Sequence, residues 1–282
     1  MFGFVQLEFP WALGPQDGRY VVRGHAGEVE HVLVLATLGA PQRHRLRGRR
    51  PRRAAPDPAP VPIARATLVA ARAFADQRAA ERWLRAATDD RDAAAARVRD
   101  AVAVLNRVLH LHRAATADPH VREVDADQAL VVRLGFGDGE QVADGHWLRA
   151  VEPPLPRAGR RREAALRPQE RLAALLGARD AALACEELAL RARQDVDAGR
   201  RREAALQLEV ALVTALAELE PWAPRGDIAA RLEELRELRP AVQGAARAAL
   251  QGGVDDDEDA AVRHALERLE AALRARTALG FD

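Results

Sequence analysis

The spacing of the apolar residues changes once along the 282-residue chain, near residue 152, and this change constrains the fold more than any other feature. Before it, short runs rich in Val, Leu and Phe are separated by Gly and Pro, a pattern typical of strands. After it, apolar residues recur at intervals of three and four, as on one face of a helix. The sequence therefore predicts an α+β protein. We expect a mixed strand and helix domain at 1–150, a linker at 151–161, and an all-α domain of bundled or hairpin helices at 162–282.

Strand patterns dominate the first domain. Strands are expected at residues 2–9, 20–22, 30–38, 63–74 and 128–134. Asp76 is expected to cap a short helix, and a longer helix is predicted at 89–115. The run Gly135–Gly139 is interpreted as a hairpin turn, because its spacing is not that of a nucleotide-binding loop and no helix pattern follows. The second strand of this hairpin is predicted within residues 140–148.

Helical patterns fill the second domain, and Gly and Pro separate them. The expected helices lie at about 162–176, 178–198, 200–220, 227–238, 240–251 and 256–277. The acidic run at 255–259 is placed at the start of the last helix, where the helix dipole favours negative charge.

The composition excludes several kinds of active site. All 43 basic residues are Arg, so the chain has no Lys, and it has no Ser either. A Ser–His nucleophile, a Walker-type phosphate loop and a Schiff-base lysine are therefore excluded. The single cysteine, Cys185, allows no disulfide within the chain and no Cys-based zinc site. We interpret it as a small core residue.

The eight histidines do not follow a metal-binding motif. His110 and His112 are two residues apart on a predicted helix, so their side chains point in nearly opposite directions. A site built from His112, His120 and Asp118 is conceivable but has no motif behind it. We therefore predict no catalytic constellation, no metal site and no cofactor.

Arginine and proline are concentrated in one internal segment. Residues 41–55 carry seven arginines and no acid, and alternate prolines follow as far as Pro62. Such a segment cannot bury enough apolar surface to order itself, so we predict a disordered loop at about 41–62.

This loop, together with a second basic segment in the linker, could bind RNA, DNA or an anionic surface, because each Arg can neutralise a phosphate. The residues assigned to polyanion binding are Arg43, Arg45, Arg47, Arg49, Arg50, Arg52, Arg53, Arg157, Arg160, Arg161 and Arg162. The competing interpretation is a solvated loop in a chain from a GC-rich coding sequence, since Lys, Ile, Asn and Tyr are all scarce.

One stretch of the second domain, Asp195–Leu219, resembles a helical hairpin of tetratricopeptide-like or HEPN-type proteins. Those families also place Gly in the turn, followed by a pair of Ala residues and a long apolar helix. The HEPN resemblance implies a ribonuclease with closely spaced Arg and His. The hairpin itself contains no His, and the pair with suitable spacing, Arg107 and His112, lies in the other half of the chain.

These observations favour a non-enzymatic protein of the cytoplasm that acts through residues 162–282, by binding a protein partner or by self-association. The first alternative is a polyanion-binding adaptor. The second is an enzyme, ribonuclease-like or other, whose site the sequence does not reveal. The cytoplasmic expectation rests on two absences, that of a signal peptide and that of an apolar segment of about 18 residues that could form a transmembrane helix.

Overall fold

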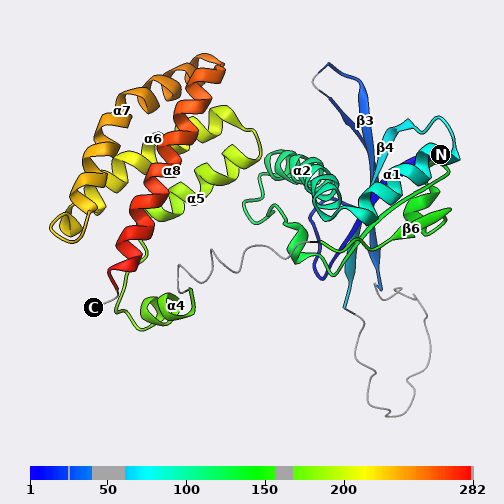
Figure 1. The fold of residues 1–282 in the computed structure, drawn as a ribbon, viewed down its shortest axis with the longest axis horizontal. Coiled ribbons are helices and arrows are strands. Elements are labelled where there is room, and N and C mark those ends of the chain that lie inside the picture. Colours follow the sequence, from blue (N-terminus) through cyan, green and yellow to red (C-terminus); the bar gives the residue numbers. More distant parts are fainter. Residues whose placement is uncertain (25, 40–60, 156–167, 281–282) are drawn as a thin grey trace, which may run out of the picture. The chain divides into compact units, whose positions relative to one another are not determined.

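The computed structural model describes residues 1–24, 26–39, 61–155 and 168–280 (Figure 1). The chain forms two compact units, Met1–Ala158 and Gly159–Asp282. The first contains an antiparallel sheet with helices and the second is helical, so the predicted α+β class is confirmed. Nearly all of the predicted Arg/Pro-rich loop (41–60) and residues 156–161 of the predicted linker lie outside the described residues.

The first unit is built on a six-stranded antiparallel sheet with the order β2-β3-β4-β1-β5-β6. The strands are β1 (Phe2–Phe9), β2 (Gly18–Arg23), β3 (Val29–Leu38), β4 (Ile63–Ala73), β5 (Val131–Gly137) and β6 (Arg149–Val151). The first four lie where the sequence predicts strands, because their apolar runs are rich in residues that suit a pleated, half-buried surface.

Two helices, α1 (Gln77–Asp89) and α2 (Arg91–Thr116), pack on one face of this sheet (Figure 1). Asp76 caps α1 as predicted, since its side chain accepts a hydrogen bond from the backbone N–H of Ala79 (2.7 Å). Asp90 caps α2 in the same way. Alternate residues of the strands point to the helices, so Leu7, Leu33 and their neighbours form one core with α1 and α2.

The hairpin predicted after residue 134 is wrong in its details. β5 continues to Gly137, residues Gly139–Asp144 form the 3₁₀ helix η2, and the partner strand is β6. A Cβ atom on Gly135 would lie 2.6 Å from Cζ of Phe4, and one on Gly137 would lie 2.7 Å from Cγ1 of Val142. These glycines are thus strand positions that admit the Phe4 ring and η2 to the second face of the sheet.

That second face also carries a buried polar row. Gln6 Nε2 donates to Thr67 Oγ1 (3.0 Å), and both residues are fully buried. Glu8 Oε1 accepts hydrogen bonds from Arg65 (2.9 and 3.0 Å) and Arg133 (3.2 Å). Gln6 pairs with Thr67 and Glu8 with Arg65 in the strand register, so the row satisfies its own polar groups within the sheet.

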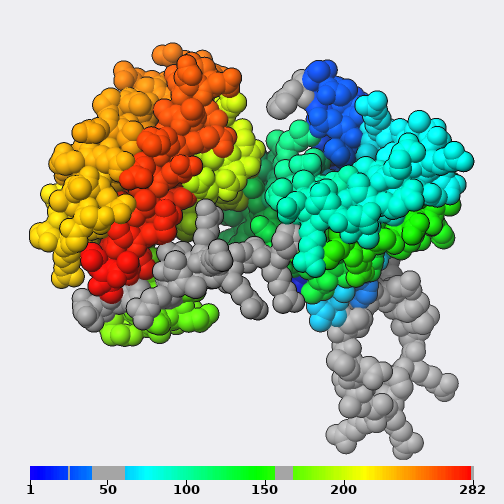
Figure 2. Space-filling view, viewed as in Figure 1, coloured from blue at the N-terminus to red at the C-terminus, as the bar shows by residue number. Residues whose placement is uncertain are grey.

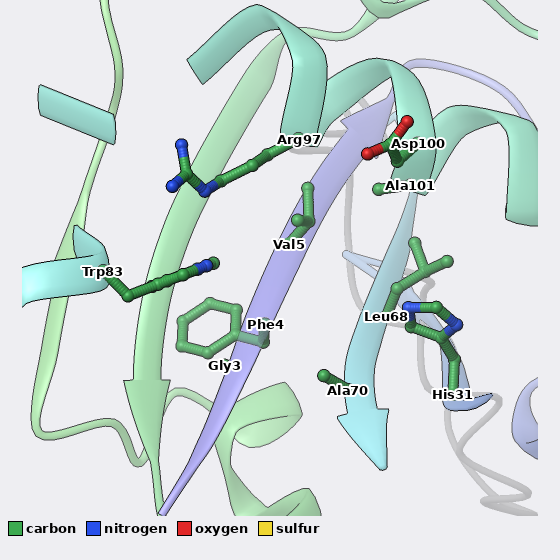
Figure 3. A pocket seen from close by; sticks show the side chains of 10 residues that line it. All are labelled: Gly3, Phe4, Val5, His31, Leu68, Ala70, Trp83, Arg97, Asp100 and Ala101. Carbon is green, nitrogen blue, oxygen red and sulfur yellow. The ribbon is translucent and has the colours of Figure 1, made fainter. Parts of the chain in front are cut away.

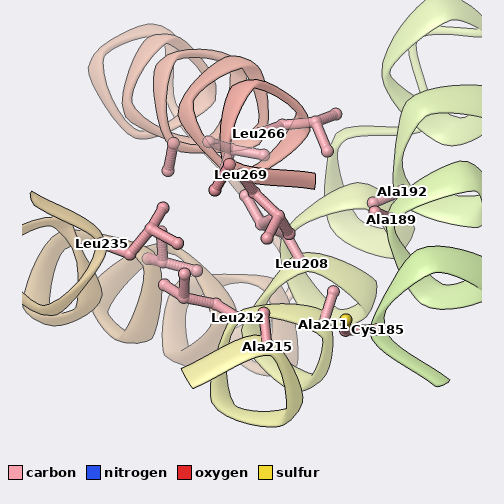
Figure 4. Close-up of a cluster of buried hydrophobic side chains, with 14 of the residues drawn as sticks. Cys185, Ala189, Ala192, Leu208, Ala211, Leu212, Ala215, Leu235, Leu266 and Leu269 are labelled. Carbon is pink, nitrogen blue, oxygen red and sulfur yellow. The ribbon is translucent and has the colours of Figure 1, made fainter. Parts of the chain in front are cut away.

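The second unit contains five long helices among the described residues. They are α4 (Pro168–Leu176), α5 (Ala184–Asp197), α6 (Arg201–Glu218), α7 (Ile228–Gln251) and α8 (Asp256–Ala278). The central helix α6 contacts α5, α7 and α8. Leucines from α6, α7 and α8 point toward one another, whereas small residues such as Ala189 and Ala211 line the α5–α6 contact and let those helices approach closely (Figure 4). In the space-filling view, α7 and α8 pack side by side without a gap (Figure 2).

Two helix boundaries differ from the prediction. The two helices predicted at 227–238 and 240–251 form one helix, α7 (Ile228–Gln251), with Pro240 inside it, because Leu235 and Val242 on either side of the proline are fully buried in the same core. The helix predicted at 178–198 begins only at Ala184, since Gly177 and Ala178 end α4, with Ala178 in the left-handed region (φ 54°). Residues 162–167 of the first predicted helix lie outside the described residues.

Among the described residues, every helix is too short or too polar to span a lipid bilayer.

Candidate ligand-binding pocket

A pocket lies in the first unit, between the helix-covered face of the sheet and the helices α1 and α2. It exists because one row of the sheet carries small side chains. On the helix-covered face, one row of neighbouring side chains across β3, β4 and β1 consists of Leu33, Leu68 and Val5. The adjacent row across the same strands consists of His31, Ala70 and Gly3. The missing side-chain volume leaves a cavity of about 190 Å³.

Helix α2 supplies one wall of the pocket. Arg97, Asp100 and Ala101 are spaced by three and one residues, so they lie on the same side of the helix and all line the cavity. Helix α1 contributes Trp83, whose ring packs against Phe74 with 5.6 Å between ring centroids. Figure 3 shows Arg97 and Trp83 on one side of the pocket and Asp100 and His31 on the other, with Val5 between them.

His31 carries a buried polar atom without a partner. Its Nδ1 atom is shielded from solvent and makes no hydrogen bond, although buried polar atoms are normally paired. Burial lowers the pKa of His31, and the positive charge of Arg107 lowers it further, while Glu30 and Asp100 oppose these effects. Because the net pKa shift is downward, the imidazole is neutral at pH 7 and one ring nitrogen is an acceptor.

Arg97 and Asp100 also have unused binding capacity. The Arg97 guanidinium lies 5.5 Å from the centre of the Trp83 ring and donates to the carbonyl of Ala93 (3.0 Å). Within the described residues no carboxylate pairs with Arg97 and no cation pairs with Asp100. Other arginines of the chain, such as Arg65 and Arg193, are bonded to carboxylates. The pocket is therefore lined by an arginine and an aspartate without ion-pair partners in the described residues, and Arg97 is half-buried whereas Asp100 is exposed.

The structure does not place the arginines that are predicted to bind polyanions. All of them, Arg43 to Arg53 and Arg157 to Arg162, lie outside the described residues, so their role stays a prediction.

Cys185 is confirmed as a core residue. It is fully buried at the start of α5, and burial, together with the hydrogen bond to Glu218 and the negative charge of that residue, raises the pKa of its thiol to about 12. Glu218 has a structural role here, since its carboxylate accepts hydrogen bonds from the backbone N–H groups of Ala184 (3.2 Å) and Cys185 (2.9 Å) and so caps α5. A thiol held this way does not supply a thiolate nucleophile at pH 7.

The other residues considered as sites do not converge. Arg107 bonds to Glu30 (3.1 Å) on β3, whereas the His112 ring lies beside Gly14, so this pair does not form a common site. In the described part of the chain there is no cluster of three His, Cys, Asp or Glu side chains with metal-binding geometry, and this includes His112, His120 and Asp118.

The helical unit presents an apolar stripe on α6. Val210 (53%), Val213 (42%) and Ala217 follow one another at helical spacing and are exposed, whereas Leu206, one turn earlier, is half-buried and packs against the core. The opposite side of α6 is buried in the core. This helix is therefore apolar on both sides, and only one side is covered in the described structure.

Comparison of the chain with protein-family models, with curated proteins and with solved structures gives no match.

Proposed function

We propose that this protein is a binding protein whose first unit takes up a small organic molecule in the pocket between the sheet and α2. The observation that supports this proposal is a cavity lined by Arg97 and Asp100, neither of which has an ion-pair partner among the described residues. The half-buried Arg97 guanidinium keeps donor N–H groups beyond its bond to Ala93, so a ligand with an acceptor group would gain hydrogen bonds there.

The pocket residues favour binding over covalent catalysis. Neutral His31 could accept a proton, but the lining residues include no nucleophilic hydroxyl or thiol. The proposal keeps the cytoplasm as the compartment, in agreement with the single free, buried cysteine.

The test is a fragment screen on the full chain by ligand-observed NMR, repeated on Ala70→Leu. The added leucine side chain would fill the floor of the pocket, so we expect the fragments that bind the native chain to lose binding in this variant. Ala36→Leu is the matched control, because Ala36 is also a half-buried strand alanine but lies on the other face of the sheet. If no fragment binds, or if Ala70→Leu binds as the native chain does, the proposal is wrong.

A second candidate function, interaction through the helical unit, is favoured by the exposed stripe on α6. We propose that this stripe packs against the same stripe of a second copy, because an apolar helix face is self-complementary about a twofold axis. Light scattering at increasing concentration should then show dimers, and Val210→Asp combined with Val213→Asp should abolish them. Leu250→Asp, at an exposed leucine of α7, is the control. A native chain that stays monomeric at high concentration contradicts this proposal.

A further inference from the structure

We propose that the ligand of the pocket is a small aromatic monocarboxylate of about the size of benzoate. Its carboxylate would bind the Arg97 guanidinium, and its ring would lie on the floor that Gly3 and Ala70 form. This inference rests on the proposed function, since it names the chemical class that the same pocket would bind.

The carboxylate would bind donor groups of Arg97 that the protein does not use. Nη1 donates to the carbonyl of Ala93 (3.0 Å), and the other N–H groups of this side chain donate to no described residue. The Nε and Nη2 groups of an arginine form a planar fork that matches a carboxylate. Arg65 uses this pair of groups to bind one carboxylate oxygen of Glu8 (3.0 and 2.9 Å). A ligand carboxylate would thus give Arg97 the kind of partner that Glu8 gives to Arg65.

Trp83 lies next to both the guanidinium and the floor of the pocket. The guanidinium is 5.5 Å from the centre of the indole ring, and this cation–π contact, with the bond to Ala93, holds it in place. A Cβ atom on Gly3 would lie 3.5 Å from Cη2 of the same ring. Because one indole ring adjoins both parts of the pocket, one small ligand can contact both.

The floor is flat because two neighbouring strands carry small residues there. Ala70 on β4 and Gly3 on β1 lie in one row, whereas Leu68 and Val5 in the adjacent row are bulky and offer only apolar contacts (Figure 3). A planar ring can lie on such a floor and bury its apolar surface. A cavity of about 150 Å³ holds benzene, so the cavity of about 190 Å³ present here suits a benzene ring with one carboxylate.

Asp100 also lines the pocket but does not exclude an anion at Arg97. Its side chain is exposed, and Figure 3 shows it on the opposite side of the pocket from Trp83. Water around an exposed carboxylate weakens its repulsion of another anion. Arg97 is half-buried against the indole ring, so water weakens its attraction for a carboxylate less.

The test measures dissociation constants for the full chain at pH 7 by isothermal titration calorimetry. Benzoate is compared with benzamide, which has the ring without the charge, and with acetate, which has the charge without the ring. Benzoate should bind at least about tenfold more tightly than either, because each lacks one of the two contacts. Hexanoate, whose flexible chain must be ordered on binding, should bind at least about threefold more weakly than benzoate.

Variants locate the two contacts. Arg97→Gln should remove the preference for benzoate over benzamide. Arg99→Gln, at an exposed position of the same helix that does not line the pocket, should leave this preference unchanged. Ala70→Leu should weaken the binding of both compounds at least about tenfold, because the added side chain occupies the floor, and Ala36→Leu should not. Far-UV circular dichroism and thermal unfolding establish that each variant is folded, and the comparison of compounds on the native chain needs no variant.

The outcomes separate this inference from the proposed function. If fragments bind in an Ala70-dependent manner but benzoate binds no more tightly than benzamide, the carboxylate inference is wrong and the ligand pocket stands. The inference is also wrong if the preference persists in folded Arg97→Gln, if hexanoate binds as tightly as benzoate, or if folded Ala70→Leu binds benzoate as the native chain does. If no compound of either set binds, both proposals fail.

Discussion

Asp180 and Arg276 form a buried ion pair in the helical unit, and each side chain is only 6% exposed. Arg276 Nη2 lies 2.5 Å from Asp180 Oδ1, and Arg171 bonds to Glu186 (2.5 and 2.7 Å) and to Asp180 (3.4 Å). The Trp222 ring lies 4.9 Å from the Arg276 guanidinium. These two arginines and two carboxylates balance in charge, and they connect α4, the segment before α5, the start of α5 and the end of α8.

The first prediction concerns the response of this network to acid. Burial by itself would raise the pKa of Asp180, but hydrogen bonds from Arg276 and from the backbone N–H of Ala181, together with the charges of Arg276 and Arg171, lower it. A lowered folded-state pKa gives stability that is fully present above the ordinary value of 3.8 and is lost as the pH falls through the folded-state value. The free energy of unfolding of the helical unit should therefore decrease in this acid range.

Asp180→Asn tests this origin of the acid sensitivity. At pH 7 it should lower the free energy of unfolding by about 2 to 4 kcal/mol, because the buried Arg276 loses its closest carboxylate and keeps only the more distant Glu186 (3.6 Å). It should also flatten the decrease below pH 4. Urea unfolding followed by helical circular dichroism measures both effects. Asp257→Asn, an exposed acid in the first turn of α8, should change stability by less than about 1 kcal/mol. Equal acid sensitivity in Asp180→Asn and the native chain would contradict the prediction.

The second prediction concerns Gly135. A Cβ atom there would lie 2.6 Å from both the Arg149 carbonyl oxygen and the Phe4 ring, so Gly135→Ala should destabilise the first unit by about 1 to 3 kcal/mol. Gly18→Ala is the matched control in β2, where an added Cβ meets only Tyr20 at 3.9 Å. Combining Gly135→Ala with Phe4→Leu should recover part of the loss, which a double-mutant cycle in urea would detect. Additive effects would show that the Phe4 ring is not the obstacle.

The pocket residues show why the candidate site could not be found from the sequence. The chain has eight histidines, and His31 is one that lies in a strand pattern. Arg97 and Asp100 look like ordinary surface charges of an amphipathic helix. Their meeting depends on the strand register that sets His31 opposite Ala70, and the sequence contains no signal for this register. Gly3 stands out among the bulky residues of β1, but Ala70 is one of five alanines in β4 and gives no such hint.

At the scale of elements, the sequence predicted the helices and strands whose apolar spacing is long and regular. β1, β3, β4, α2 and α8 lie within a few residues of their predicted ranges. Where tertiary packing outweighs a local signal, the prediction is wrong. The Gly-rich run after residue 134 looked like a turn but admits Phe4 and η2, and Pro240 looked like a helix end but lies within α7. At Gly135 the deciding contact comes from Phe4, which is far away in the sequence. At Pro240 it comes from the buried residues Leu235 and Val242 on the neighbouring helical turns.

The third prediction concerns the effect of Pro240 on the stability of α7. Pro240 is exposed and lacks the N–H group that would bond to the carbonyl of Arg236, so Pro240→Ala restores that bond without changing the core. We expect the free energy of unfolding of the helical unit to rise by about 1 to 3 kcal/mol, measured by urea unfolding. Pro168→Ala is the control, because Pro168 is the first residue of α4, where proline is well tolerated. A less stable Pro240→Ala would show that the proline is needed for the packing of α7.

At the scale of the whole molecule, each unit contains its own hydrophobic core. The buried cluster around Leu208, Leu235 and Leu266 consists only of residues from the helical unit, and the cluster around Leu7, Leu68 and Leu105 only of residues from the first. The pocket is likewise lined only by residues of the first unit. A core complete within one segment of chain is the condition for independent folding.

The fourth prediction is that residues 1–155 and 156–282, expressed separately, each unfold cooperatively in urea, with the second fragment keeping a helical circular dichroism spectrum. Because every pocket residue lies in the first fragment, that fragment should bind the small molecules found in the screen with the affinity of the full chain, within about threefold. Calorimetry on the fragment and on the full chain measures this directly. A first fragment that folds but binds at least about tenfold more weakly would mean that residues 156–282 contribute to the site. A fragment that does not unfold cooperatively would mean that its core is incomplete without the rest of the chain.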